Sequence, residues 1–558
     1  TLGPLDNSTA APLGQELAAL LLGIPGGNMA TSASFAGQNK YAGFYVHDDY
    51  RVSSKLTVNL GLRYEMEWPL TERYNRLVAG FNFGAASPVE AQAKVNYAKN
   101  PIPELPVSAF AAKGGLTFAD GANRSPYARN NGHFLPRVGM AYQWNQKTVF
   151  RAGYGIYFDT LGVDRFIPTQ SGFSQLTPIQ ASLDNGLSFV ATAANPLPGG
   201  LLPPLGAAGG LSTNLGQAIT FYDPKVNQPY SQRWSLGVQR YLPGEFLIDA
   251  SYVGNRSTHL GVTRNINATP NSYLSTSALR DQKTIDFLTT RFPSPFSGLN
   301  KVYGSTMTRA DLLRPFPQFG DISVQTADGY AWYHSMQVRV EKRFSKGYTF
   351  MAGYTLSKYM QATEYLNAGD PLPYRSLSDF DRPQIFTMSG VYELPFGKGR
   401  RFGSSMAKPL EGAFGGWQLN STVVRQSGAP LGFGNALFIG DISTIALAKG
   451  ERTADRWFNT SAPFDKNTRN QLANNLRTFP LRFGGVRSDG QSTWNFSLAK
   501  NFTIYERLKA QFRAESYNAM NHPSFANPNT TPTNSAFGVV TQTNSEPRNW
   551  QFALRLNF

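Results

Sequence analysis

Apolar and polar residues that alternate along many segments, connections that alternate between short and long, and tryptophans near the segment ends together predict an all-β protein. The specific fold that these features predict is a transmembrane antiparallel meander β-barrel, with about thirteen strands in this chain of 558 residues. Alternation gives each strand one apolar and one polar face, as in a sheet with lipid on one side and a water-filled lumen on the other.

The alternation recurs in segment after segment. Leu60 and Leu62 fall on one face of a predicted strand, whereas Arg63 falls on the other. We expect lipid on the leucine side, with Tyr354, Leu554 and Leu556, and the lumen on the arginine side, with Arg339, Arg513 and Arg555. The thirteen predicted strands are 40–52, 56–68, 134–145, 148–159, 230–243, 246–259, 332–345, 348–361, 383–395, 416–430, 493–504, 507–520 and 549–558.

The connections alternate strictly in length. Five tight turns, at 53–55, 146–147, 244–245, 346–347 and 505–506, and a longer turn at 396–415 alternate with long segments rich in Pro, Asn, Gly and Ser. Short turns on the periplasmic side and long loops on the outside are typical of outer-membrane barrels. We therefore predict extracellular loops at 69–133, 160–229, 260–331, 362–382, 431–492 and 521–548.

Tryptophan supports this orientation. Of the eight tryptophans, only Trp457 lies in the middle of a predicted loop. Indole rings prefer the boundary between membrane and water, so tryptophans at both ends of the strands indicate two aromatic girdles. The seven at strand ends are Trp68, Trp144, Trp234, Trp332, Trp417, Trp494 and Trp550.

The last predicted strand alternates without a break from Trp550 to Phe558 and ends on an aromatic residue. A closing strand of this kind resembles the C-terminal strand that serves as an assembly signal in bacterial outer-membrane barrels. We therefore predict that Trp550 and Phe558 form an assembly signal that the barrel-assembly machinery reads. The simpler alternative is the last strand of a soluble sheet.

The net charge of +16, from 52 basic and 36 acidic residues, raises the question of a nucleic-acid partner. The basic residues are scattered over the polar faces of the strands and a few turns, and this distribution favours a solvated lumen and contact with anionic lipid. We expect outer-membrane lipid and lipopolysaccharide as partners, and no nucleic acid.

The chain contains no cysteine, so it holds neither a disulfide nor a Cys-ligated metal. No run of residues reaches the roughly 18 apolar positions of a membrane helix. Residues 1–39 are expected to be a loop, or the tail of a preceding missing segment. Because single-chain barrels generally have an even number of strands, the odd number predicted here indicates part of a larger barrel.

Several strand and turn signatures resemble the barrel of TonB-dependent receptors, and specifically the Oar-like branch of that family. The resemblance extends from about residue 17 to the end of the chain. The motifs that carry it are YAGFYVHDDYRV (41–52), LTVNLGLRYE (56–65), FLPRVG (134–139), SLSDFDRP (376–383), YELPFGKG (392–399) and FRAESYNAMNHP (512–523).

The resemblance implies a plugged barrel of about 22 strands in the outer membrane of a Gram-negative bacterium. Receptors of this family import scarce ligands with energy relayed by the TonB complex through an N-terminal plug. The sequence departs from that pattern, because neither the plug nor a TonB-contacting box is recognisable in it. The TonB complex is therefore expected to act through a missing N-terminal plug, and the motifs leave the ligand unspecified.

Catalytic signatures are not found in the sequence, and we expect neither an enzyme nor a cofactor. The five histidines are dispersed, and only His47 and Asp49 could share a ligand on one strand face, so no metal site is predicted. Asp379, Asp381 and Arg382 form a possible charge cluster at the barrel rim. This cluster has two interpretations, a calcium-binding rim site and a local ion-pair anchor for the loop.

Two functions fit these observations. The first is a TonB-dependent uptake receptor for a carbohydrate, a peptide or a metal chelate. The second is a structural or adhesive surface barrel, or one that assists secretion, without energised uptake. A plug and a TonB box upstream would favour the first.

Overall fold

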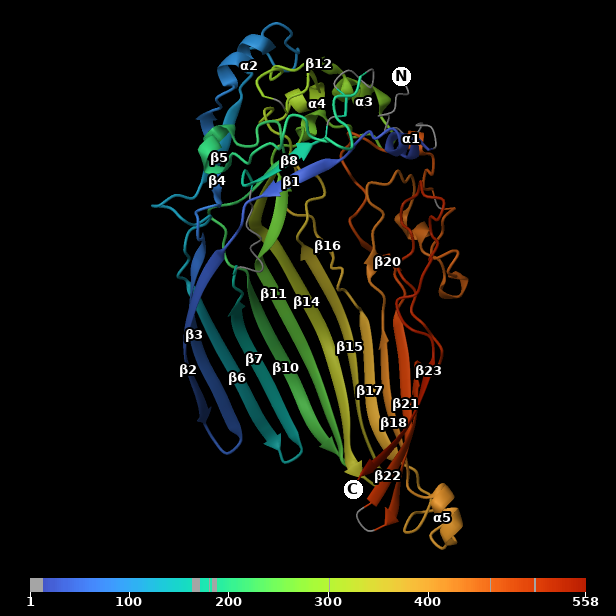
Figure 1. Cartoon of the computed structure of the whole chain (residues 1–558). Coiled ribbons are helices and arrows are strands. Elements are labelled where there is room, and N and C mark those ends of the chain that lie inside the picture. The colour runs from blue at the N-terminus through green and yellow to red at the C-terminus, as the bar shows by residue number, and fades with distance from the viewer. Residues whose placement is uncertain are drawn as a thin grey trace.

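The computed structural model describes residues 14–162, 171–179, 181–182, 188–300, 302–461, 463–505 and 508–557. Thirteen strands follow one another in a curved antiparallel meander, which confirms the predicted fold and number of strands (Figure 1). Among the described residues, no pairing joins the first strand of the meander to the last, so the sheet has two edges. The short turns lie at one end of the sheet and the long connections at the other.

The strands of the meander agree closely with the predicted spans. They are β2 (Gly37–Arg51), β3 (Leu56–Glu72), β6 (His133–Asn145), β7 (Thr148–Phe158), β10 (Tyr230–Leu242), β11 (Phe246–Asn265), β14 (Ile322–Ser345), β15 (Tyr348–Ala362), β17 (Gln384–Glu393), β18 (Trp417–Gln426), β21 (Gln491–Tyr505), β22 (Leu508–Tyr517) and β23 (Asn549–Asn557).

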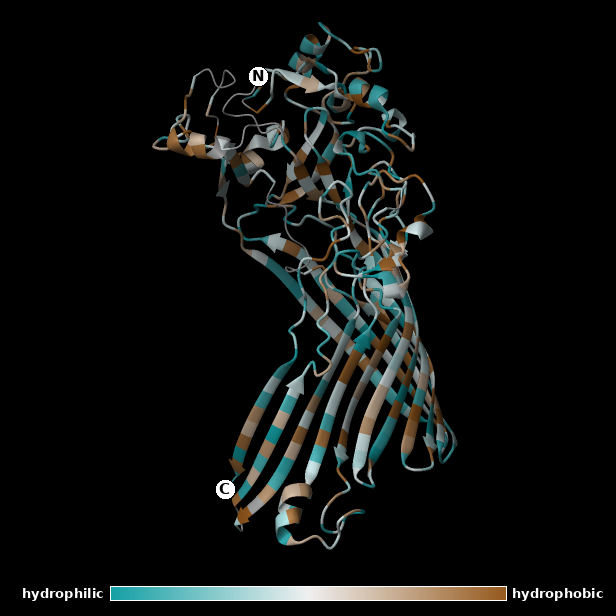
Figure 2. Ribbon diagram, turned by 90° about the vertical axis from the view of Figure 1, so that its right-hand side faces the viewer, coloured by the Kyte–Doolittle hydropathy of each residue, from teal (hydrophilic) through white to brown (hydrophobic). Residues whose placement is uncertain are grey.

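The two faces of the sheet differ as the alternation predicts. Brown and teal bands alternate along the strands in Figure 2. Cross-strand pairing places Leu60 opposite Val138 and, two strands on, Tyr154 opposite Trp234. We call this side the apolar face, and its large side chains are exposed, for example 48% of Leu60 and 68% of Leu554. Exposed apolar rows of this extent fit a sheet whose outer surface meets lipid.

The opposite side, which we call the arginine face, carries Arg63, Arg339, Arg513 and Arg555, and the pairing confirms that these arginines alternate with the apolar rows. Glu67, on the same face of β3 as Arg63, is 2% exposed. Its carboxylate accepts hydrogen bonds from the backbone N–H groups of Leu161 (3.1 Å) and Gly162 (2.7 Å). The connection after β7 therefore bends over the arginine face, which identifies that face as the lumenal one.

Four of the strand-end tryptophans are placed on the apolar face by direct pairing. Trp234 pairs with Tyr154, Trp494 with Val423, Trp550 with Ser516 and Trp417 with Lys500. Aromatic rings on the outer surface near strand ends are the arrangement of an aromatic girdle.

The long connections are folded rather than irregular. They contain short strands and helices: α1 (Gln15–Leu21), β1 (Asn28–Ser32), β4 (Val78–Ala86), α2 (Glu90–Tyr97), β5 (Lys113–Phe118), β8 (Ser174–Pro178), β9 (Ile219–Tyr222), α3 (Gln282–Thr289), β12 (Arg291–Pro293), β13 (Thr306–Thr308), α4 (Arg309–Leu312), β16 (Ser376–Leu377), β19 (Pro430–Leu431) and β20 (Phe483–Arg487). Five short 3-10 helices are η1 (Gly206–Ser212), η2 (Asn271–Tyr273), η3 (Ile442–Ile445), η4 (Lys449–Glu451) and η5 (Thr468–Asn470).

The structure differs from the sequence expectation at two of these places. Strands β11 and β14 continue to Asn265 and from Ile322, so the connection expected at 260–331 is shorter. Register shifts between Ser257 and Val262 interrupt the alternation there, which hid the extension. Residues 14–39, expected to be a loop or tail, hold helix α1 and strand β1, and β1 pairs with β8.

Among the helices of the described residues, none combines the length and the apolar character needed to cross a membrane. The helix of the turn at 396–415, α5 (Lys408–Phe414), lies at the short-turn end of the sheet (Figure 1).

Lys500 of β21 contacts this turn. It lies on the apolar face, where it pairs with Trp417, yet it is only 3% exposed. Its ammonium donates to the carbonyls of Gly415 (2.6 Å) and Ala413 (3.2 Å) and lies 5.2 Å from the centroids of both the Trp417 and Phe502 rings. A lysine is tolerated on this face because its charged end reaches the polar turn while its methylene stem stays among apolar groups.

Replacing Lys500 with methionine is expected to lower the free energy of unfolding by about 1.5–3 kcal/mol, because two carbonyls lose a charged donor. Urea unfolding in lipid vesicles, followed by gel mobility, measures the loss. The matched control is Lys509→Met, which removes an exposed lysine from the neighbouring strand β22. An equal loss in the control would contradict this role of Lys500.

Candidate functional site

A hollow of about 680 Å³ lies on the wall formed by β2, β3, β6, β7 and β10. Most of the residues that line it belong to the arginine face, so it opens towards the lumen. Its lining includes Tyr45, His47, Asn59, Gly61, Arg63, Arg137, Gly139, Gly153, Gly155, Tyr157, Arg233 and Ser235.

Small residues make the floor of this hollow. One cross-strand row runs from Asn59 through Gly139 and Gly153 to Ser235, so two neighbouring strands contribute no side chain beyond the backbone. The adjacent row contains Arg137 paired with Gly155, and Gly155 paired in turn with Arg233. Because Gly155 has no side chain, it leaves space between Arg137 and Arg233, next to both guanidinium groups.

Tyr157 fills part of that space. It lies two residues after Gly155 on the same strand face, and its ring folds back over Gly155, where an added Cβ would meet the Tyr157 hydroxyl oxygen at 3.0 Å. The guanidinium carbon of Arg137 lies 4.7 Å from the ring centroid, and that of Arg233 lies 5.2 Å from it. One aromatic ring therefore holds two cations by cation–π contact.

Two other polar residues of the hollow, Arg63 and His47, have partners on β2 and β3. Arg63 donates to Glu65 (2.6 Å) and to the hydroxyl of Tyr41 (2.9 Å). His47 lies 3.4 Å from Asp49, so the one pair that could have shared a ligand on β2 is in mutual contact. Within the described residues, no group of three or more His, Asp or Glu side chains converges on a common point.

The charge cluster expected at the rim is assembled with arginines from another connection. Asp381 is 1% exposed, and its carboxylate accepts from Arg487 (2.7 Å) and from the backbone N–H of Tyr359 (2.8 Å). Asp379 pairs with Arg482. Arg382 donates to the backbone carbonyls of Asp379 (2.8 Å) and Asp381 (3.1 Å).

Arg482 also donates to Glu364 (2.6 Å), so it joins two carboxylates. Burial alone would lower the pKa of this guanidinium, but the hydrogen bonds to Glu364 and Asp379 raise it. A second, smaller hollow of about 390 Å³ adjoins this cluster and is lined by Glu364, Asp379, Arg477 and Arg482 among others. Its carboxylate oxygens already serve arginines, which leaves few free oxygen ligands for a hard cation such as calcium.

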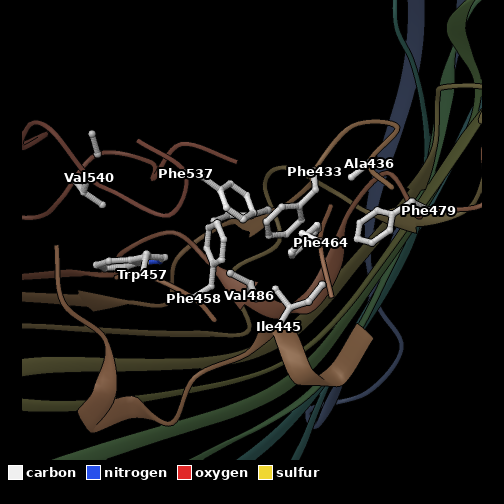
Figure 3. Close-up of a cluster of buried hydrophobic side chains, with 12 residues drawn as sticks. Phe433, Ala436, Ile445, Trp457, Phe458, Phe464, Phe479, Val486, Phe537 and Val540 are labelled. Carbon is white, nitrogen blue, oxygen red and sulfur yellow. The ribbon is translucent and has the colours of Figure 1, made fainter. Parts of the chain in front are cut away.

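The connections around the rim cluster share a hydrophobic core (Figure 3). The ring of Phe433 lies 4.9 Å from that of Phe458 and 5.1 Å from that of Phe464. Trp457, the one tryptophan expected in mid-loop, is 6% exposed in this core and donates to the carbonyl of Arg487 (2.7 Å). Residues from 431–486 and from 526–540 thus pack as one unit beside the ion pairs.

The comparisons with known proteins agree with this architecture. The model of the family described as "Outer membrane beta barrel domain" matches residues 3–551. The chain belongs to the outer membrane β-barrel domain family. This membership places the protein in the outer membrane of a Gram-negative bacterium. No curated protein matches the chain.

Solved structures similar to this barrel include the ferripyoverdine receptor of the outer membrane of Pseudomonas aeruginosa (10% identity, TM-score 0.39), which covers 94% of this chain and 39% of its own. The ferric-catecholate import receptor Fiu of Escherichia coli K12 has 9% identity and a TM-score of 0.40, and the match covers 94% of this chain and 45% of the Fiu chain. The outer membrane transporter YddB of Escherichia coli has 10% identity and a TM-score of 0.39, and the match covers 94% of this chain and 54% of the YddB chain. The chain thus spans between 39% and 54% of the length of these structures.

The assembly signal predicted for the barrel is placed only in part. Trp550 begins the exposed apolar row of β23 and is 60% exposed, with its ring stacked 6.4 Å from that of Phe552. Phe558 lies outside the described residues. The role of the two residues in assembly stays a prediction.

Sequence reasoning missed the centre of the lumenal hollow of this barrel. In the sequence, Arg137 belongs to the FLPRVG motif at 134–139, whereas Tyr157 and Arg233 fall in none of the motifs named above. The available signal was the glycine content of the strands, because Gly153 and Gly155 alternate with Tyr154 and Ile156 on β7. Arg482 and Arg487 were also missed, since no local pattern indicates which loop they contact.

We expect Asp381→Ala to open the loops of the barrel much more than Asp379→Ala does. Removing the carboxylate leaves the Arg487 guanidinium buried without its ion-pair partner, which costs about 3–5 kcal/mol of stability. Asp379 has 58% of its side chain exposed, and the loss of a pair at such a site costs below about 1 kcal/mol. Rates of trypsin cleavage within 431–492, measured on intact outer membranes, compare the two variants; equal rates would contradict the difference.

Proposed function

We propose that this chain is the barrel portion of a TonB-dependent outer-membrane receptor that takes up a scarce ligand, namely a carbohydrate, a peptide or a metal chelate. The observation that carries the proposal is the lumenal hollow with cationic and aromatic side chains over a floor of small residues. A purely structural barrel needs no hollow of this kind on its inner wall.

The folded connections support the same function. Their buried cores and ion pairs hold them in defined positions above the lumen, and the side of the long connections is extracellular in outer-membrane barrels. Fixed loops at the entrance can present a specific surface to a ligand, because little conformational entropy is lost when the ligand binds.

The partners of this proposal are outer-membrane lipid and lipopolysaccharide, the barrel-assembly machinery during biogenesis, and the TonB complex acting through a plug on the same polypeptide. None of the proposed steps forms or breaks a covalent bond, so we propose a transporter and not an enzyme.

The test is uptake in the source bacterium. We expect deletion of the gene to lower accumulation of one labelled solute from a panel of a maltooligosaccharide, a tripeptide and a ferric catecholate. The same uptake should stop when a protonophore removes the proton gradient, because energised transport depends on it. As the control, expression of the gene from a plasmid in the deletion strain should restore accumulation of that solute.

Unchanged accumulation of all three solutes, together with lost surface adhesion or secretion in the deletion strain, would favour the structural or secretion-assisting barrel instead.

A further inference from the structure

We propose that Arg137, Tyr157 and Arg233 form an anion site on the lumenal wall, which binds a carboxylate or phosphate group of a solute in the lumen. The inference rests on the proposed uptake function and narrows its ligand to a class, the solutes that carry such groups.

The first argument is unbalanced charge. Among the described residues, Arg63 is paired with Glu65, Arg339 with Glu341 and Arg513 with the amide oxygen of Gln511. Within the part of the chain that the structure describes, Arg137 and Arg233 have no ion pair or hydrogen bond, and both lie over the ring of Tyr157. Arginine does not lose its proton in proteins, so two like charges lie side by side on this wall with no acidic partner among the described residues.

The second argument is spacing. Arg137 and Arg233 pair with the same residue, Gly155, from its two sides. Neighbouring strands lie about 4.8 Å apart, so the two arginines start about 10 Å apart, and the ring of Tyr157 folds over the glycine between them. Their long side chains converge on this ring. An anion there can accept hydrogen bonds from both planar guanidinium groups, which suit two-oxygen acceptors.

The third argument is preorganisation. Tyr157 lies between the two guanidinium groups and restricts their rotation, because a cation is attracted to the face of an aromatic ring. The ring folds over Gly155, because the glycine has no side chain to occupy that space. Arginines held in position lose less conformational entropy on binding than free ones do.

The fourth argument is access. Arg137 and Arg233 are both exposed, and they adjoin the glycine floor of the hollow. Both guanidinium groups therefore face the lumen, and neither needs a movement of the wall to meet an anion there. A neutral sugar has no need of two uncompensated cations, whereas a ligand with several carboxylates or phosphates does.

The experiment uses the full-length protein extracted from outer membranes in detergent, with citrate as the carboxylate probe and inorganic pyrophosphate as the phosphate probe. Calorimetry is expected to show saturable binding of at least one probe. Arg137→Gln and Arg233→Gln should each weaken it by about tenfold, the value of one lost charge-assisted hydrogen bond. Arg513→Gln, which removes the same charge from the same face on β22, is the matched control and should leave the affinity unchanged.

A second measurement needs no variant. Hydroxyphenylglyoxal modifies exposed arginines, and mass spectrometry reports each site. The bound probe should protect Arg137 and Arg233 and leave Arg513 reactive. Protection by citrate alone identifies a carboxylate ligand, and protection by pyrophosphate alone identifies a phosphate ligand.

Binding that persists in the Arg137→Gln/Arg233→Gln double variant, equal weakening in Arg513→Gln, or no binding and no protection with either probe would overturn the site. Binding in detergent does not require energised transport, so the site can stand even if uptake fails. Conversely, uptake that persists in the double variant would reject the anionic ligand and leave the transport function intact.

Discussion

Hydrogen bonding between neighbouring strands is the interaction on which the other features of this barrel depend, because hydrocarbon offers peptide groups no water as an alternative partner. Pairing strand to strand satisfies the backbone and, at the same time, fixes which side chains share a row. Arg137, Gly155 and Arg233 come together for this reason alone. The backbone hydrogen bonds that allow the sheet to exist in lipid therefore also bring together the residues of the lumenal hollow.

Apolar side chains act in opposite ways in the two parts of the molecule. On the apolar face of the membrane-spanning strands they point outward, as Leu60 and Leu554 do. In the connections the same residue types turn inward and build separate buried clusters, one around Phe433 and another around Phe110 and Phe296. Water surrounds the connections, so the hydrophobic effect can order them there, whereas in lipid it cannot.

Local periodicity predicted the strands and their faces well, because alternation needs only the neighbouring residues. Register is different. Counting back from the Asn145–Thr148 pair at the β6–β7 turn places Arg137 opposite Ile156, but a shift between Gln143 and Asn145 brings Gly155 there instead. That one-residue shift decides whether the two arginines flank a glycine, and no residue type in the turn predicts the shift. The sequence also indicates a charge cluster that includes Asp379, yet the partner of Asp379, Arg482, lies 103 residues away, beyond any local pattern.

The shared core of the connections has an evolutionary consequence. Phe433, Phe464 and Phe537 come from two different connections, and Arg482 fastens that unit to a third. Sequence change in one connection is then coupled to its neighbours, because exchanging a single connection would expose the aromatic residues of the next. We therefore expect the connections between residues 362 and 548 to change together during evolution, as one block.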